Sequence, residues 1–322
     1  MTTTAQTIPV ASLADFDAGG ARREAFVKTI GDALVDTGFF SIEGHGVGQK
    51  LIDDANAMGA RFFALSEDQK RAYEIPDEGG QRGYTSFGRE HAKDSKAPDL
   101  KEFWHVGQDL APTHALYSVY PKNVWPTELA GFREVFWGLF SELERCSLKL
   151  LQACALYIGE PQDRFSGIAR DGNTILRVIH YPPIPQAAHP ASIRAAAHED
   201  INLITLLCEA TAGGLELLER NGSWRPIHAL KGQIVVDAGD MLQNITNGFY
   251  KSTTHRVVNP DNSRDRRFSM PLFVHPRSDA NLDPLPSCVA RTGGTKTFPP
   301  ITAGAYLAQR LAEIGLTNKK PG

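Results

Sequence analysis

Apolar residues recur at helical spacing in several long segments of the chain. The spacing predicts helices over residues 21–36 and 50–73, and a longer one that starts at Trp125-Pro126 and carries an apolar stripe as far as Cys154. A shorter helix is predicted around 306–314. Because each segment is apolar along one side, we expect these helices to pack on a core, and the longest to back a sheet.

Between residues 174 and 274 the apolar period changes from helical spacing to alternation. The predicted strands, including two near the N-terminus, are 8–10, 39–42, 215–218, 234–236 and 268–274. Asn221-Gly222 marks a hairpin turn. Many short strands separated by turns predict a mainly β fold with flanking α-helices: a jelly-roll core, or double-stranded β-helix, with a helical N-terminal region and a long backing helix.

Nothing in the sequence marks a domain boundary. We see no linker composition, internal repeat or low-complexity segment, so the prediction is one domain over 1–322, with a helix-rich N-terminal region over 1–125 and the jelly-roll core over 170–276. The segment 77–95 is rich in glycine and charge. A loop of this length within a compact domain is usually functional or disordered, and its role stays open.

Composition and charge exclude several kinds of partner. The chain has 322 residues, 42% hydrophobic and 22% charged, with a net charge of −3. Without a basic excess, a nucleic-acid partner has no electrostatic support. The N-terminus lacks a signal-peptide pattern and the sequence contains no long apolar run, so we expect a cytoplasmic protein with no membrane partner. The four widely spaced cysteines are expected to be free thiols, and no pattern indicates the oligomeric state.

His198, Asp200 and His255 are the candidate metal ligands. If His198 and Asp200 share a strand, their side chains point to the same face, and His255 arrives from a later β-rich segment. Two histidines and one carboxylate form the facial triad of non-haem Fe(II) oxygenases. A zinc protease would need a second histidine four residues after the first, where this chain has asparagine. His228 and His275 are competing histidines, and a structural role is favoured for both.

Several blocks around this triad resemble, in the same order, the isopenicillin N synthase-like family of 2-oxoglutarate-dependent non-haem Fe(II) dioxygenases. The matching blocks are Leu176-Arg177-Val178-Ile179-His180-Tyr181-Pro182-Pro183, Gly239-Asp240-Met241-Leu242-Gln243, residues 246–257 and Arg267-Phe268-Ser269-Met270-Pro271-Leu272-Phe273. The resemblance implies an enzyme that uses Fe(II), 2-oxoglutarate as cosubstrate and O2. Such an enzyme hydroxylates, desaturates or cyclises a small-molecule substrate and releases succinate and CO2.

The expected cosubstrate site consists of Arg267, Ser269 and Tyr181. Arg267 and Ser269 are two apart on a predicted strand and so share a face. A planar guanidinium beside a hydroxyl is suited to the distal carboxylate of 2-oxoglutarate. The resemblance adds the hydroxyl of Tyr181. The interval from His255 to Arg267 is slightly long for the family, so Arg266 is the alternative.

Phe273, Arg177 and Tyr84 are the predicted substrate contacts. Phe273 alternates with the expected carboxylate-binding positions and should face inward, Arg177 is expected to meet an anionic group, and Tyr84 lies in the long loop.

Two alternative functions remain open. The first is an Fe(II)/O2 oxidase like isopenicillin N synthase, which needs no 2-oxoglutarate and which the block Asp200-Ile201-Asn202-Leu203-Ile204-Thr205 resembles. The second is a non-catalytic jelly-roll metal-binding or sensor protein. An activity that requires 2-oxoglutarate would exclude the first alternative. If neither 2-oxoglutarate nor O2 perturbed the bound metal, the second alternative would be supported.

Overall fold

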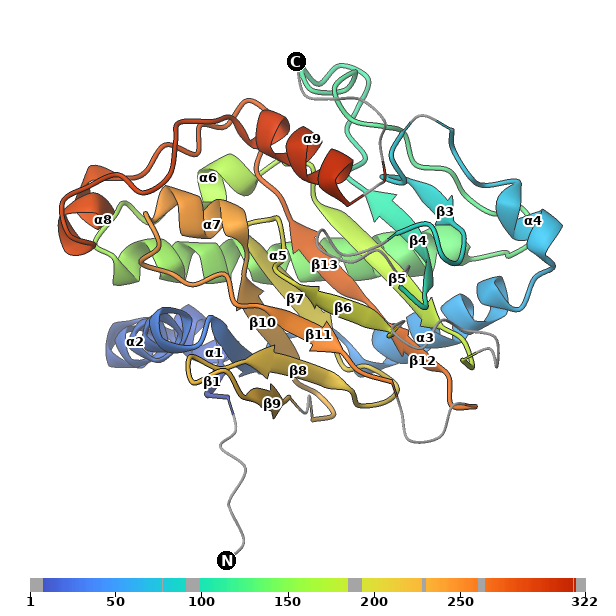
Figure 1. The fold of residues 1–322 in the computed structure, drawn as a ribbon, viewed down its shortest axis with the longest axis horizontal. Helices are drawn as coiled ribbons and strands as arrows, with labels where there is room; N and C mark the ends of the chain where they lie inside the picture. The colour runs from blue at the N-terminus through green and yellow to red at the C-terminus, as the bar shows by residue number, and fades with distance from the viewer. Residues whose placement is uncertain are drawn as a thin grey trace, which may run out of the picture.

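Two β-sheets lie at the centre of the protein (Figure 1). The computed structural model describes residues 8–76, 78–90, 99–184, 193–227, 230–259, 264–314 and 316. Within them, the large sheet has nine strands and the small one has four. This arrangement confirms the predicted jelly-roll core.

The large sheet joins strands from both halves of the chain. In spatial order its strands are β1 (Val10–Ser12), β2 (Phe39–Glu43), β10 (Ile234–Ala238), β7 (Ile204–Cys208), β13 (Pro271–Val274), β5 (Ile175–Tyr181), β4 (Glu102–Gly107) and β3 (Gly83–Thr85), with β12 (Arg267–Ser269) also paired to β5. The small sheet runs β6 (Ala195–His198), β11 (His255–Val257), β8 (Leu215–Leu218) and β9 (Trp224–Pro226). β8 alternates between buried and half-buried residues, as expected of a strand covered on one face.

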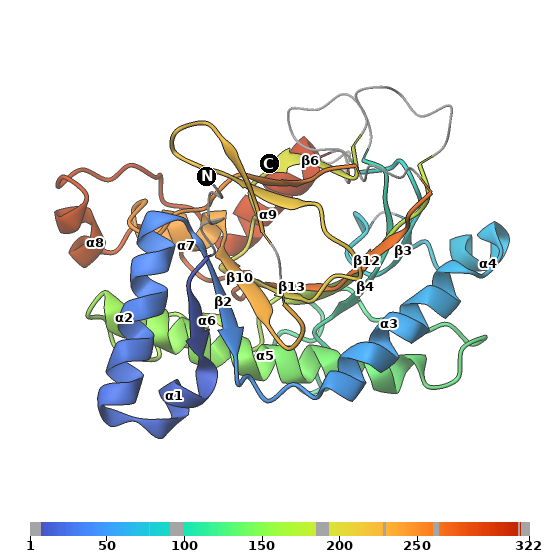
Figure 2. The same ribbon diagram turned by 90° about the horizontal axis from the view of Figure 1, so that it is seen from below.

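The described residues form nine helices, several of which, including the longest, cover the outer face of the large sheet (Figure 2). The helices are α1 (Leu13–Ala18), α2 (Gly20–Asp36), α3 (Gln49–Phe63), α4 (Glu67–Arg71), α5 (Phe132–Tyr157), α6 (Ser166–Ala169), α7 (Asp240–Ile245), α8 (Pro286–Arg291) and α9 (Ala303–Glu313). The longest, α5, packs against α2, α3 and strands β7 and β13. It is therefore the predicted backing helix. No helix among the described residues is long and apolar enough to cross a bilayer.

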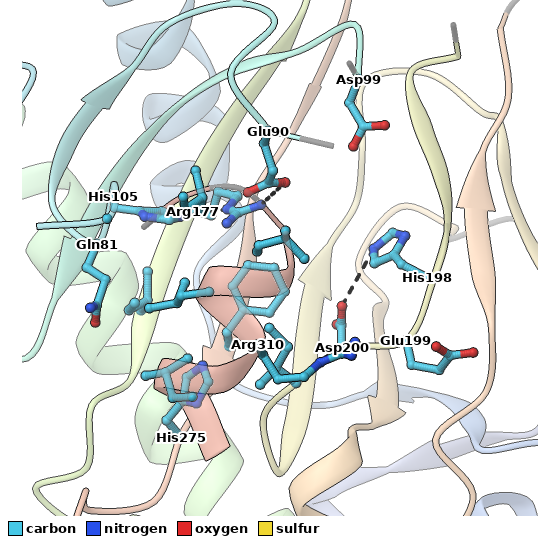
Figure 3. A pocket seen from close by; sticks show the side chains of 18 of the residues that line it. Gln81, Glu90, Asp99, His105, Arg177, His198, Glu199, Asp200, His275 and Arg310 are labelled. Atoms are coloured by element: carbon cyan, nitrogen blue, oxygen red, sulfur yellow. Dashed lines mark hydrogen bonds and ion pairs between the residues drawn. The ribbon is translucent and has the colours of Figure 1, made fainter. Parts of the chain in front are cut away.

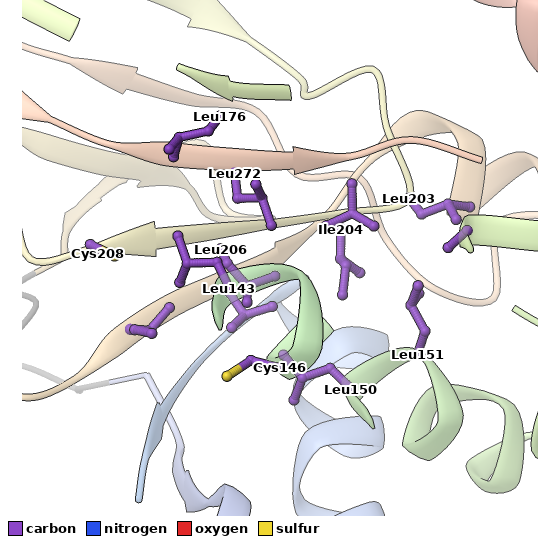
Figure 4. Packing of buried hydrophobic residues seen from close by; sticks show 14 of the residues in the cluster. Leu143, Cys146, Leu150, Leu151, Leu176, Leu203, Ile204, Leu206, Cys208 and Leu272 are labelled. Atoms are coloured by element: carbon purple, nitrogen blue, oxygen red, sulfur yellow. The ribbon is translucent and has the colours of Figure 1, made fainter. Parts of the chain in front are cut away.

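Leucines from α5 and from the sheet form the core between these layers (Figure 4). Leu143 and Leu150 belong to α5, Leu206 to β7 and Leu272 to β13, and all four are fully buried. Burial of each such side chain contributes about 1.5–3 kcal/mol relative to exposure. This packing anchors the large sheet on α5 beneath the candidate site.

Three predicted elements differ from the structure. The helix expected over 50–73 is divided, because Ser66 begins α4 with a capping box in which Ser66 and Gln69 bond each other's backbone N–H groups. The longest helix begins at Phe132 and not at Trp125, directly after Gly131 in a left-handed conformation. The strand expected over 268–274 divides at Met270, because β12 pairs with β5 alone whereas β13 also pairs with β7.

Candidate active site

Two neighbouring strands of the small sheet bring the two histidines together. His198 is the last residue of β6 and pairs across the ladder with His255 of β11. Asp200 lies two residues beyond the end of β6, not on the strand as expected, yet its Oδ1 is 3.8 Å from His198 Nε2 and 3.7 Å from His255 Nε2. The three predicted ligands therefore converge, and one ligand atom from each lies within 4.8 Å of the others.

Backbone carbonyls set the orientation of both imidazoles. Nδ1 of His198 lies 2.7 Å from the carbonyl of Ala196, and Nδ1 of His255 lies 3.2 Å from that of Thr253. An Nδ1–H that donates to a carbonyl leaves the Nε2 lone pair free, which is the tautomer that a metal ligand requires. Burial, and then the neighbouring His255, lower the pKa of His198 to about 4, so its ring is neutral at pH 7.

Asp200 is held by residues of its own loop, of β7 and of α7. The Thr205 hydroxyl donates to Oδ2 of Asp200, and Asn202 donates to Thr205 Oγ1 at 3.1 Å. The backbone carbonyl of Asp200 accepts from the N–H of Asp240 at 2.7 Å. One carboxylate oxygen is thereby fixed by the protein, and Oδ1 faces the histidines.

This donor set fits Fe(II). Two neutral imidazoles and one carboxylate on one side of a cavity are the ligands of a facial triad with open positions. Adjacent ligands of an octahedral ion with bonds of about 2.1 Å stand about 3 Å apart, so a small inward movement of the three side chains would complete the site.

A cavity of about 60 Å³, here called the Arg267 cavity, adjoins the triad. It is lined by the three ligands and by residues that include Tyr181, Thr205, Asp237, Arg267, Ser269 and Phe273. Arg267 is 2% exposed, its Nε donates to the carbonyl of Ala212 at 3.0 Å, and its NH1 has no hydrogen-bond partner among the described residues. A buried guanidinium nitrogen without a partner is suited to bind a carboxylate.

Pairing of β12 with β5 places the other expected cosubstrate residues beside Arg267. Tyr181 is opposite Arg267 in the ladder, and its ring lies 5.1 Å from the guanidinium carbon. Ser269 lines the same cavity. Arg266, the alternative, is exposed, so the structure favours Arg267.

A second cavity of about 140 Å³, here called the α9 cavity, also borders His198 and Asp200 (Figure 3). Its apolar wall includes Ile175, Ile201, Phe273 and, from α9, Leu307 and Leu311. Its polar lining includes Gln81, Glu90, Asp99, Lys101, His105, Arg177, His275 and Arg310. Phe273 lines both cavities, as expected of an inward-facing side chain.

Only one of the other two expected substrate contacts lines the α9 cavity. Arg177 lines the α9 cavity, but its NH1 donates to Glu90 at 3.1 Å and its Nε to His105 at 2.6 Å, so its charge is already neutralised within the protein. Tyr84 is buried against Phe62 and donates to Glu102, and it is not among the residues that line the cavity. The expectation of a substrate contact at Tyr84 is not supported.

Much of the polar lining could not be predicted from the sequence. Glu90 lies in the long loop, Asp99 and Lys101 directly before β4, and His105 in β4, and these residues gather near Arg177 of β5 only in the folded protein. His275, treated as structural, lines the α9 cavity, and burial lowers its pKa to about 4. His228 lies outside the described residues. Asp237 was also missed; burial, then the charge of Asp200, raise its pKa well above the usual value.

Comparisons with known proteins agree with this arrangement. The N-terminal model of non-haem dioxygenases, described for morphine synthesis, matches residues 8–128, and that of the 2OG-Fe(II) oxygenase superfamily matches 172–276. A homoarginine-6-hydroxylase of Oryza sativa subsp. japonica is 30% identical over 88% of both chains. A 2-oxoglutarate-Fe(II) type oxidoreductase of Aspergillus fumigatus is 31% identical over 88% of this chain and 86% of its own.

Comparison with solved structures indicates the same family. A 2OG-Fe(II) oxygenase family protein from Caulobacter crescentus superposes with a TM-score of 0.84 at 39% identity, over 95% of this chain and 99% of its own. The structure of Neurospora crassa T7H in complex with alpha-KG superposes with a TM-score of 0.85 at 27% identity, over 97% of this chain and 98% of its own. The fold and the triad define a non-haem iron oxygenase. The chain belongs to the 2-oxoglutarate–Fe(II) oxygenase family, and it is a 2-oxoglutarate-dependent dioxygenase that uses Fe(II) and O2.

Proposed function

We propose that this enzyme hydroxylates a small molecule held in the α9 cavity, with His198, Asp200 and His255 as the iron ligands. The observation that carries the proposal is the convergence of two free Nε2 lone pairs and one carboxylate oxygen where the two cavities are both lined by His198 and Asp200. Iron bound there supplies the activation of O2 and the attack on a C–H bond, coupled to decarboxylation of 2-oxoglutarate to succinate and CO2.

The Arg267 cavity is the proposed cosubstrate site. The unpartnered NH1 of Arg267 binds the distal carboxylate of 2-oxoglutarate, and the hydroxyls of Ser269 and Tyr181 donate to the same group. The 2-oxo acid end then reaches the metal ligands, which line the same cavity. These residues bind and orient the cosubstrate, and their burial excludes water from it.

Size supports a small substrate. A cavity of about 150 Å³ holds a benzene-sized molecule, and the α9 cavity is of about 140 Å³. Thymine is bound by T7H according to the description of one solved complex, and homoarginine is the substrate named for the rice relative. We propose that the substrate of this enzyme is of comparable size. A nucleic-acid substrate has no support from the charge of the chain.

We further propose that the chain folds as one oxygenase unit in a reducing compartment, the cytoplasm. β2 and β4 of the N-terminal region pair directly with β10 and β5 of the jelly roll, so the two regions share a sheet. All four cysteines are buried and unpaired, as is usual where thiols stay reduced.

The test is to incubate the Fe(II)-loaded enzyme with 2-oxoglutarate, O2 and a panel of small cyclic compounds and amino acids. We expect succinate in equal amount to a product heavier by one oxygen atom. His198→Ala should abolish both, whereas His114→Ala, a partly exposed histidine outside both cavities, should not. Product formation that continues without 2-oxoglutarate would contradict the proposal and favour an oxidase.

A further inference from the structure

Glu90 carries a buried oxygen atom that nothing in the described part of the protein uses. The side chain is less than one-tenth exposed and lines the α9 cavity (Figure 3). Its Oε1 accepts from Lys101 Nζ at 2.6 Å and from Arg177 NH1 at 3.1 Å. Its Oε2 has no hydrogen-bond partner among the described residues. A buried carboxylate oxygen in this state lacks an interaction that a bound molecule can supply.

The charges around Glu90 disfavour an ionic ligand. Lys101 also binds Asp99 at 2.8 Å, so two carboxylates and two cations are packed together at this end of the cavity. An incoming anion would meet Glu90 and Asp99, and an incoming cation would meet Lys101 and Arg177 at close range. Burial alone would raise the pKa of Glu90, but Arg177 and Lys101 outweigh it and hold the pKa well below its usual value. The carboxylate that lines the cavity is therefore an ionised acceptor in a locally neutral cluster.

The remaining lining limits the size and shape of the ligand. Phe273, Leu307 and Leu311 offer an apolar wall, and the volume of about 140 Å³ suits one six-membered ring. His275 is 5% exposed and its Nδ1 has no partner among the described residues, so it offers a second polar contact. Figure 3 draws Glu90 and His275 on different sides of this space.

We propose that Glu90 determines substrate specificity: its Oε2 accepts an N–H or O–H of a small, uncharged, ring-sized substrate whose apolar face packs on Phe273. This inference rests on the proposed function, because it assigns the substrate of that same site. The hydrogen bond places one edge of the substrate at the Glu90 cluster, and the rest of the ring extends toward His198 and Asp200 in the same cavity.

The substitution Glu90→Gln tests the hydrogen bond directly. Lys101 and Arg177 both donate to the Oε1 position, so the Gln side chain must present its oxygen to them. Its NH2 then replaces Oε2 and faces the cavity as a donor. The variant therefore reverses the hydrogen-bonding character of the wall while nearly preserving its shape. Glu142→Gln, on the solvent side of α5 and paired with Arg145, is the matched control.

The probes are 2-piperidinone, its N-methyl and 3-methyl derivatives, piperidinium and cyclohexanecarboxylate. Their dissociation constants are measured by calorimetry on the anaerobic complex of the enzyme with Fe(II) and 2-oxoglutarate. We expect the two N–H lactams to bind at least tenfold more tightly than the N-methyl lactam and both ions. The 3-methyl lactam controls for the added volume. In Glu90→Gln, the affinity for the N–H lactams should fall at least tenfold and the affinity for the N-methyl lactam should not. Glu142→Gln should bind all the probes as the wild type does.

Other outcomes overturn the inference. These are no binding of 2-piperidinone, equal affinity of the N-methyl and 3-methyl lactams, tighter binding of either ion, or no effect of Glu90→Gln. If Glu90→Gln fails to fold, the comparison of the lactams on the wild-type enzyme still decides. Failure of the wild-type enzyme to bind 2-oxoglutarate would instead contradict the proposed function, so the two failures are distinguishable.

Discussion

The hydroxyl of Thr205 donates a hydrogen bond to Oδ2 of Asp200, and this bond leaves Oδ1 directed at the two histidines. Thr205 lies at the second position of β7, in the large sheet, whereas Asp200 lies in the loop after β6. The sheet therefore fixes the orientation of a ligand that its own loop would leave free.

Substitution Thr205→Val should weaken metal binding while preserving the fold. Valine has nearly the same shape but cannot donate to Asp200, and loss of such a supporting hydrogen bond typically lowers metal affinity 10–100-fold. Thr205→Ser should keep most of the affinity because it retains the hydroxyl. Calorimetric titration with Mn(II), a redox-stable stand-in for Fe(II), measures the effect. Equal affinity in Thr205→Val and the wild type would exclude this role.

The inner face of α9 should control the substrate and not the cosubstrate. Leu311 of α9 lines the α9 cavity, and no residue of α9 lines the Arg267 cavity. We therefore expect Leu311→Glu to reduce substrate turnover at least tenfold, because it introduces a charge into the apolar wall, while 2-oxoglutarate affinity stays within about twofold. The control is Gln309→Glu on the exposed side of the helix. A parallel loss of 2-oxoglutarate binding in Leu311→Glu would contradict this separation.

The stability of the metal-free protein should fall as the pH falls below about 6.5. Burial holds the pKa of His275 near 4 and that of His105 well below its usual value, so the folded state resists protons that the unfolded state accepts. The stability that this difference provides is complete above the unfolded pKa and is lost as the pH falls toward the folded one. Between pH 7.5 and 5.5, the low pKa of His275 should reduce the free energy of unfolding by about 1.4 kcal/mol, and His105 should add to this loss.

Urea unfolding at the two pH values measures this effect. The substitution His275→Asn should remove about 1.4 kcal/mol of the loss, and His114→Asn, which changes a partly exposed histidine, should remove little. A pH dependence that is the same in His275→Asn and the wild type would show that burial of this ring has no such effect.

The contact between α2 and α5 depends on Gly31. A Cβ at this position would overlap the ring of Tyr157 in α5. Gly31→Ala should therefore destabilise the protein by about 1–3 kcal/mol, despite the higher helix propensity of alanine. Gly167→Ala in α6, where a Cβ would meet nothing within 4 Å, should be neutral or stabilising. Thermal unfolding of the two variants compares them, and equal effects would contradict the packing argument.

The local sequence pattern was sufficient to predict the fold class and the convergence of the metal ligands. Many short strands separated by turns predict the jelly roll, whereas the i, i+2 spacing of His198 and Asp200 and the family resemblance of the blocks around them and His255 predict that the three ligands converge. The division of the helix at Ser66 also had a local signal, since Ser66 and Gln69 have the spacing of a capping box.

The substrate side of the site could not be predicted in the same way. Glu90 meets Arg177 across 87 positions of sequence, and neither residue shows by itself that the other neutralises it. The side to which Tyr84 points depends on its pairing with Trp104 of β4 and on α3, whose Phe62 it contacts. Contacts of this kind are set by tertiary packing, which periodicity does not encode.

The measurement that tests the central claim most directly is an anaerobic titration of 2-oxoglutarate into the Fe(II)-loaded protein. Chelation of a 2-oxo acid by Fe(II) produces a visible charge-transfer band. We predict the band in the wild type, its loss in His255→Ala, and a cosubstrate requirement at least tenfold higher in Arg267→Ala but unchanged in the exposed control Arg266→Ala. An unaltered band in His255→Ala, or equal affinities in the two arginine variants, would contradict the assignment of this site.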